Sequence, residues 1–153
     1  MSMYLFYNHS TGDDYEKEAE PWAADQDITN WDVSNVTNMS FLFFRSKYFN
    51  QDISNWDVSN VTNMNSMFCE AISFNQPIGK WNVSNVTDMT SMLEDAESFN
   101  QSLEKWNVSK DTDMDSMFDG SGICRPVSWN DDSKDVVEDN RRKGNCRGYE
   151  LMK

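Results

Sequence analysis

The chain has 153 residues, of which 38% are hydrophobic, and a formal net charge of −13. This length suits one folded core rather than two independent domains, and 6 Trp, 9 Phe and 10 Met exceed what a disordered acidic chain carries. The negative charge opposes nucleic acid and anionic lipid as partners, because binding either takes clustered Lys and Arg that this chain lacks.

No apolar run approaches the roughly 20 residues of a transmembrane helix, so we expect no membrane insertion. The opening residues, MSMYLFYNHS, hold a short apolar patch without a basic flank and do not resemble a signal peptide. We therefore expect an intracellular location, or one within an assembly such as a virion, unless a leader was removed. Cys69, Cys124 and Cys146 show no zinc spacing, and whether Cys124 pairs with Cys146 stays open.

A nine-residue segment recurs every 25 residues. The repeated block lies between two flanks that do not share the repeat. The copies of the segment are WDVSNVTNM twice, WNVSNVTDM and WNVSKDTDM, at 31–39, 56–64, 81–89 and 106–114. Self-similarity at this period indicates coils that stack on one another. We predict an N-terminal capping flank at 1–23, a four-coil solenoid at 24–121, and a C-terminal cap and tail at 122–153, because both ends of a stack need cover.

Each coil begins with a pattern typical of a strand. Trp56 and Val58 alternate with the polar Asp57, as in a half-buried strand. We predict that the tryptophans of the four coils form one buried spine, each ring packing against those above and below. These residues are Trp31, Trp56, Trp81 and Trp106.

The second part of each coil has the apolar spacing i, i+3, i+4, i+7, which predicts a two-turn helix. In the second coil these residues are Met64, Met67, Phe68 and Ala71. Thr62 precedes them as a candidate helix cap. The predicted fold is thus an α/β repeat, a leucine-rich-repeat-like solenoid of strand, turn and short helix with parallel strands. The Asn-Gln pair that follows each helix is expected to bond turns and the next coil.

Two sets of side chains are candidates for partner contacts. The first set comprises two outward rows on the strand face, which change from acidic to basic along the stack: Asp32, Asp57, Asn82 and Asn107, beside Asn30, Asn55, Lys80 and Lys105. The second is Phe41 with Phe44, which point outward where the next coil has Ser66 and Cys69. Either MYLFY at 3–7 folds over this aromatic pair or another protein contacts it. The rows themselves are either a contact face or a merely solvated one.

No catalytic residue, metal site, cofactor or small-molecule substrate is expected. The single histidine, His9, has no recognisable nucleophile beside it, and no Gly-rich phosphate loop is present. The segment DTDMDSMFDG at 111–120 has the Asp spacing that opens a calcium loop. However, Ser116 and Gly122 stand where such a loop needs Gly and Glu, so we expect Asp113 and Asp115 to cap a helix instead.

The segment FNQDISNWDVSNVTNM, followed by MF, resembles the BspA-like surface-protein repeat, a relative of leucine-rich repeats. The resemblance covers residues 24 to about 121 and departs mainly at Asp111, which replaces a core valine, and in both flanks. It implies an extended solenoid that contacts other molecules and brings no catalytic residues.

The expected function is therefore a non-catalytic solenoid for protein–protein contacts, as a structural or accessory subunit of a larger assembly such as a virion or membrane complex. The alternative is a cell-surface adhesion module that binds host proteins or glycans. An acidic mimic of nucleic acid is a third class, supported by charge alone.

Overall fold

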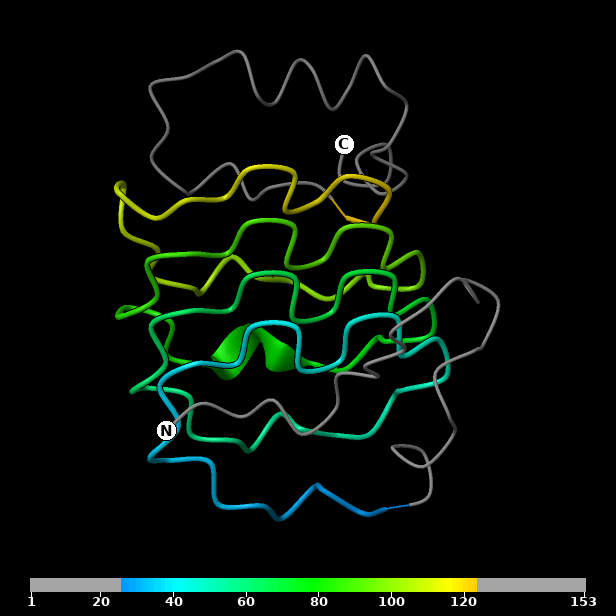
Figure 1. Cartoon of the computed structure of the whole chain (residues 1–153), viewed down its shortest axis with the longest axis horizontal. Coiled ribbons are helices and arrows are strands. Elements are labelled where there is room, and N and C mark those ends of the chain that lie inside the picture. The colour runs from blue at the N-terminus through cyan, green and yellow to red at the C-terminus, as the bar shows by residue number, and fades with distance from the viewer. Residues whose placement is uncertain (1–25, 124–153) are drawn as a thin grey trace, which may run out of the picture.

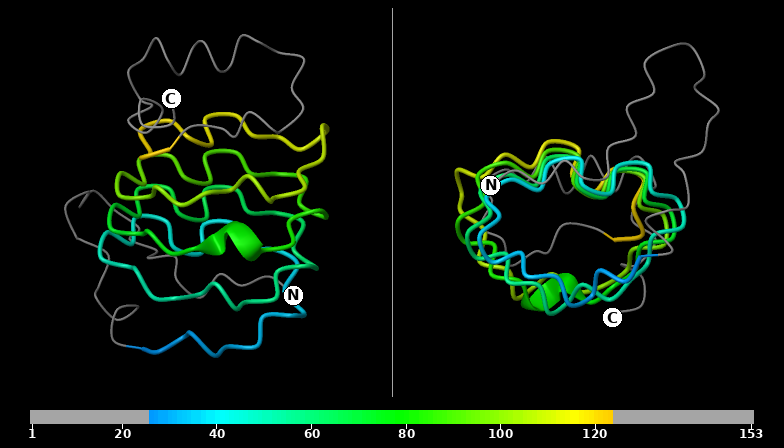
Figure 2. Two further views of the ribbon diagram at one scale, coloured as in Figure 1. Left: turned by 180° about the vertical axis from the view of Figure 1, so that it is seen from behind. Right: turned by 60° about the horizontal axis from the view of Figure 1, so that its bottom comes forward.

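The structure, a computed structural model, describes residues 26–123, which wind into a flattened stack of coils (Figure 1). Seen nearly along the stack, successive coils follow almost the same closed outline (Figure 2). Parallel bridges join Asn38 to Asn63, Asn63 to Asp88 and Asp88 to Asp113. The 25-residue period is therefore the length of one coil. Coils 1 to 4 are defined as residues 26–50, 51–75, 76–100 and 101–123.

Regular secondary structure is sparse in this part of the chain. Its one helix is the 3-10 helix η1 (Ile78–Lys80), and the strand-like pairing consists of isolated bridges rather than extended strands. Neither the predicted strand at 56–58 nor the predicted helix at 64–71 is formed. That part of the fold prediction was wrong, whereas the stacking of parallel-bridged segments at the repeat period is present.

Consecutive turns replace the predicted helix because its backbone donors bind another coil. The N–H groups of Met64, Ser66 and Phe68 donate to carbonyl oxygens 24 positions ahead, in coil 3, at 2.8, 2.8 and 2.9 Å. An α-helix would use such donors within the segment. Turns closed between residues i and i+3 place the apolar residues inside at the same i, i+3, i+4, i+7 spacing. The apolar pattern alone therefore does not distinguish this arrangement from a helix.

These turns require left-handed backbone at residues that are not glycine. Ser66 and Glu70 have φ of 51° and 58°, and each is the third residue of a turn closed by an i+3 hydrogen bond. A positive φ at this position is characteristic of a type II turn. The same pair of positions is left-handed in every coil: Phe41 and Arg45, Ser66 and Glu70, Ser91 and Asp95, and Ser116 and Gly120.

Stacked phenylalanine rings fill the core between these turns and the opposite side of the coil. Within a coil, Phe43 stacks on Phe49 and Phe68 on Phe74, with ring centroids 3.8 and 3.9 Å apart. Between coils, Phe43 stacks on Phe68 at 5.5 Å. Phe74 also stacks on Phe99 of coil 3, at 5.7 Å. The buried aromatic cluster is thus continuous across the first three coils.

The tryptophans of coils 2, 3 and 4 are each tied to the preceding coil through the indole nitrogen. The indole N–H groups of Trp56, Trp81 and Trp106 donate to the carbonyl oxygens of Ile28, Ile53 and Ile78 at 3.2, 3.2 and 3.0 Å. These three side chains are 3–4% exposed, whereas Trp31 of coil 1 is half-buried. The rings of Trp56 and Trp81 lie against Phe43 and Phe68 of the preceding coil. The same hydrogen bond from a tryptophan side chain therefore recurs at each step of the stack.

Amide side chains join the coils at the return segments, as expected from the recurring Asn-Gln pair. The Asn75 backbone N–H donates to Asn50 Oδ1 at 2.9 Å, and Gln76 Nε2 donates to the Asn50 carbonyl oxygen at 2.9 Å. Asn100 and Gln101 repeat these bonds to Asn75. The pair thus has the structural role predicted for it.

The recurring threonines join coils and do not cap helices. Both the backbone N–H and Oγ1 of Thr62 donate to the Thr37 carbonyl oxygen, at 2.8 and 3.1 Å. Thr87 makes the same two bonds to Thr62. The cap predicted for Thr62 was therefore wrong, because there is no helix to cap and the preceding coil offers an acceptor.

Coil 4 departs from the pattern where Asp111 occupies the position of a core valine. The equivalent residues Val36, Val61 and Val86 are buried, but Asp111 is exposed. The local turn closes one residue later, from Thr112 N to the Ser109 carbonyl oxygen at 3.1 Å. Thr112 is buried instead, and its hydroxyl donates to the Val86 carbonyl oxygen at 2.9 Å. The chain shifts because burying an unpaired carboxylate is costly.

The predicted flanks at 1–23 and 122–153 fall largely outside the described residues, as do the segment MYLFY and the Cys124–Cys146 alternative. The division into two flanks and a repeated block therefore stays a prediction.

The indole hydrogen bond predicts the effect of replacing Trp81 with phenylalanine. The substitution keeps an aromatic ring but removes one of the two hydrogen bonds to the buried Ile53 carbonyl oxygen, which still accepts from the Trp56 backbone N–H at 3.1 Å. We expect it to lower the free energy of unfolding by about 1 kcal/mol. The matched control is Lys80→Ala at the exposed neighbouring position. This substitution should change the free energy of unfolding by less than about 0.5 kcal/mol. Denaturant unfolding measures both. Equal stability of the two variants would show that the indole bond contributes little.

Candidate functional site

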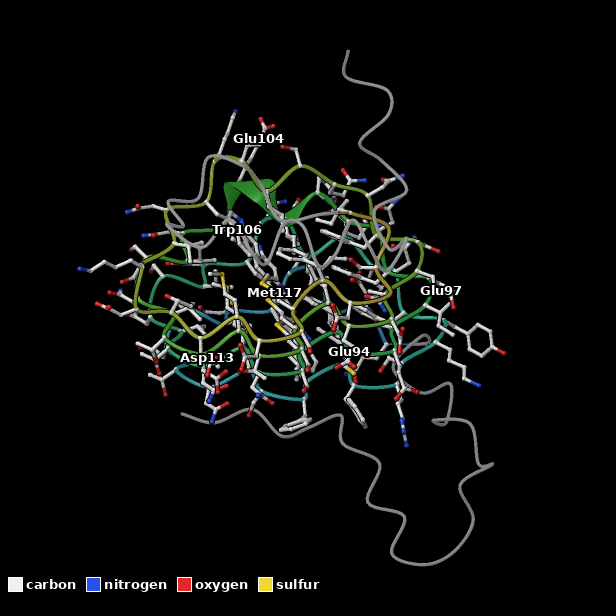
Figure 3. All side chains as sticks on the ribbon, turned by 90° about the horizontal axis from the view of Figure 1, so that it is seen from above. Glu94, Glu97, Glu104, Trp106, Asp113 and Met117 are labelled. Carbon is white, nitrogen blue, oxygen red and sulfur yellow. The ribbon has the colours of Figure 1, made fainter. Side chains whose placement is uncertain are left out.

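The flattened coils give the stack two broad, opposite faces. Figure 3 looks down the stack and shows Glu104 on the side of η1, with Asp113 and Glu94 on the other side. We call the first the η1 face, formed by 27–32, 52–57, 77–82 and 102–107. The second is the turn face, formed by 38–45, 63–70, 88–95 and 113–120. Met117 points inward between them (Figure 3).

The structure brings the predicted partner-binding rows together on the η1 face. All eight side chains are exposed, and they stand at matching positions of the four coils: Asn30, Asn55, Lys80 and Lys105, beside Asp32, Asp57, Asn82 and Asn107. Charge along this face therefore changes from acidic in coils 1 and 2 to basic at Lys80 and Lys105. Whether the rows contact a partner stays a prediction.

The acidic row also has a structural role that the sequence analysis missed. Asp32 Oδ1 accepts hydrogen bonds from Ser34 Oγ at 2.6 Å and from the Ser34 backbone N–H at 3.0 Å. Asn82 Oδ1 accepts the same pair from Ser84 at 2.8 and 3.2 Å. Such bonds close Asx turns. The Asp/Asn-x-Ser spacing in each copy of the repeat was the available signal.

These turns lower the pKa of the carboxyl groups in the row. The hydrogen bond from the Ser34 side chain, followed by that from its backbone, lowers the pKa of Asp32. The Ser59 side chain and backbone lower the pKa of Asp57 in the same way, and the neighbouring Asp32 charge opposes this shift. The ionised form of each carboxylate is therefore part of the folded turn.

The turn face has a different character at its coil 1 end, where aromatic and cationic side chains gather. Phe41 and Phe44 meet edge to face with ring centroids 5.7 Å apart, and the Arg45 guanidinium lies 5.0 Å from the Phe44 ring centroid. Arg45 Nε also donates to Glu70 Oε1 at 2.9 Å. Phe41 is 36% exposed. The sequence analysis found both phenylalanines but missed Arg45, although Glu70 follows it by one repeat period.

The other end of the turn face is acidic. The carboxylates of coils 3 and 4 on this face are Asp88, Glu94, Asp95, Asp113, Asp115 and Asp119. Their field acts on Cys69, which lies between the two ends. Burial, followed by the charges of Glu94, Glu70 and Asp95, raises the pKa of the Cys69 thiol to about 12. This cysteine is therefore a protonated, buried thiol at neutral pH.

Among residues 26–123, no group of three or more His, Cys, Asp or Glu side chains is placed to hold a metal ion. Asp113 and Asp115 had been expected to cap a helix, but they do not. Instead, Asp113 Oδ1 accepts the Asp115 backbone N–H at 3.1 Å and closes a turn. Within the same residues, no helix has the length and apolar character needed to cross a bilayer.

A family model described as "Mycoplasma protein of unknown function, DUF285" matches residues 14–127, more than half of the chain. The chain belongs to the DUF285 family. The match spans all four coils, so the stack described above is the DUF285 region of this chain. The searches of curated proteins and of solved structures found no match.

The Asx turns of the η1 face predict how stability depends on pH. The pKa values of Asp27, Asp32, Asp52 and Asp57 are lowered in the folded chain from an ordinary 3.8. A lowered folded pKa stabilises the fold above the unfolded value, and this contribution is lost as pH falls through the folded value. We therefore expect the DUF285 chain to lose thermal stability as the pH falls below about 4.

The matched control is the fourfold Asp→Asn variant at these positions, because Asn82 already makes the same turn in coil 3. Its melting temperature, followed by circular dichroism from pH 6 to pH 2.5, should fall less than that of the wild-type chain. An identical fall in both proteins would show that other groups cause the acid sensitivity.

Proposed function

We propose that this DUF285 chain is a non-catalytic, leucine-rich-repeat-like solenoid of the BspA-like kind, whose turn face binds another protein. The parallel bridges between equivalent residues and the repeated indole hydrogen bonds support the solenoid. The proposed setting is a larger assembly, in which the chain is a structural or accessory subunit.

The aromatic pair Phe41 and Phe44 at the coil 1 end of the turn face is the observation that carries this proposal. Phe41 is one of two large hydrophobic side chains that are exposed among the described residues, and the ring of Phe44 meets it edge to face. Arg45 lies beside Phe44 in the same coil. Aromatic residues and arginine are enriched at the centres of protein interfaces, where they contribute most of the binding energy.

The stacked scaffold suits such a role because it presents these side chains at low entropic cost. The backbone beneath Phe41 and Arg45 donates hydrogen bonds to the carbonyl oxygens of Asn65 and Cys69 in coil 2, at 2.9 and 2.8 Å. Interface residues held in place before binding lose less conformational freedom on association.

Phe41→Ser tests the proposal with little risk to the fold. Serine occupies the equivalent position in coils 2, 3 and 4, with φ of 51°, 52° and 54°, close to the 59° of Phe41. We expect affinity purification from the native cells, followed by quantitative mass spectrometry, to recover at least about tenfold less of the wild-type chain's specific partner with this variant. Unchanged recovery of every partner, with an unchanged melting temperature, would contradict a protein-binding role for the turn face.

A second variant, Asp32→Asn with Asp57→Asn, examines the η1 face in the same purification. Asparagine keeps the Asx turns, as Asn82 does, so the change removes charge alone. If the row that holds Asp32 and Asp57 also contacts the partner, the amount of partner recovered should fall a few-fold, because exposed charge pairs contribute about 1 kcal/mol at most. If the variant recovers as much partner as the wild-type chain, these charges of the η1 face do not contribute to binding. The proposal for the turn face would be unaffected.

A further inference from the structure

The outward side chains of the turn face change in a regular order from one coil to the next. Three equivalent positions of the two turns hold Phe41, Phe44 and Arg45 in coil 1, Ser66, Cys69 and Glu70 in coil 2, Ser91, Glu94 and Asp95 in coil 3, and Ser116, Asp119 and Gly120 in coil 4. Of these side chains, Ser66 and Cys69 are buried. Equivalent positions lie side by side because the backbone hydrogen bonds join them. The surface therefore runs from aromatic and cationic at one end to anionic at the other.

Arg45 is held ready for a carboxylate at the coil 1 end. Its Nε donates to Glu70 and its guanidinium lies over Phe44, so two contacts fix the plane of the group. Within residues 26–123 its terminal Nη groups have no hydrogen-bond partner, and the side chain is 53% exposed. A fixed guanidinium edge with free donors binds a carboxylate in bidentate fashion. Lys47, also exposed, adds positive charge nearby.

The anionic end lacks compensating cations within the described part of the chain. The ion pair found among the described residues joins Arg45 to Glu70, and it lies at the other end of the turn face. Glu94 and Asp119 follow Phe44 and Cys69 along one column, and Asp95 stands beside Glu94. A partner that covers this end must bring positive charge, because like charges placed together across an interface are repelled.

We propose that the turn face binds an extended segment of a partner protein whose acidic and apolar side chains lie over coil 1 and whose basic side chains lie over coils 3 and 4. This inference rests on the proposed function and names the chemistry of its partner. Neighbouring coils joined by backbone hydrogen bonds are about 4.8 Å apart, so coil 1 and coil 4 are about 14 Å apart. An extended chain rises about 3.3 Å per residue, so the core of the segment has about five residues. An anionic membrane surface does not fit, because it would meet the carboxylates of coils 3 and 4.

Peptide titration followed by NMR tests this order of charge. The labelled full-length chain is titrated at low ionic strength with the acetylated, amidated peptide EEFLSKKK and with three controls, EEFLSEEE, KKFLSKKK and QQFLSQQQ. We expect the mixed-charge peptide to bind at least about tenfold more tightly than each control and to shift the Arg45 Nε–H signal and the amides of Glu94 and Asp119. Binding of any control with equal affinity, shifts confined to the η1 face, or no binding of the mixed-charge peptide would overturn the inference.

Three variants separate recognition from folding. Arg45→Gln should reduce affinity for the mixed-charge peptide about tenfold, whereas Lys110→Gln, which removes an exposed cation outside the turn face, should leave it unchanged. Glu94→Lys with Asp119→Lys should transfer the preference to the all-acidic peptide. Failure of that transfer in a variant with an unchanged melting temperature would also overturn the inference.

The outcome can be distinguished from failure of the proposed function. If Phe41→Ser loses the native partner while the peptides show no preference for charge order, the chain binds protein through this face but the inferred partner chemistry is wrong. If native capture is insensitive to Phe41→Ser, the proposed function itself fails, whatever the peptides do.

Discussion

The hydrogen bonds between backbones of adjacent coils are the constraint on which the rest of this structure depends. On the turn face, alternate N–H groups of one coil donate to carbonyl oxygens 24 positions ahead, as from Phe43 to Met67 and from Phe68 to Met92, both at 2.9 Å. Each coil therefore completes the backbone pairing of its neighbour, and no coil satisfies this requirement alone. An insertion within one coil would shift every donor after it, which explains why the period stays at 25 residues while the exposed residues vary.

The same requirement explains why unfavourable local conformations recur. A left-handed backbone at a residue other than glycine costs roughly 1–2 kcal/mol, yet seven such residues occur between Phe41 and Ser116. The tight turns they form direct alternate N–H groups to the next coil and keep methionine, leucine and phenylalanine side chains inside. The coil 4 shift at Asp111 shows the limit of this tolerance. A carboxylate is not accepted in the core, and the turn moves by one residue so that Thr112 takes the buried position.

Much of the interior could be predicted from the sequence, because burial follows from apolar side chains that recur at a fixed period. Ile28, Val33 and Met39 and most of their equivalents are buried as their spacing indicates. The local conformation could not be predicted, since inward spacing is the same for two consecutive turns and for a short helix. Competition between hydrogen bonds inside the segment and hydrogen bonds to the next coil decides between them. The Arg45–Glu70 pair was missed because it joins residues of adjacent coils, which only the stacking register brings together.

The two faces differ in how much of their sequence the scaffold already requires. On the η1 face, Asp32, Asp57 and Asn82 close local turns, so their recurrence has a structural explanation that needs no partner. On the turn face, Phe41 occupies a position where serine stands in the three other coils, so the backbone there does not require an aromatic side chain. The aromatic and cationic end of the turn face is therefore the part of this face at which the side chains differ most from those of the other coils.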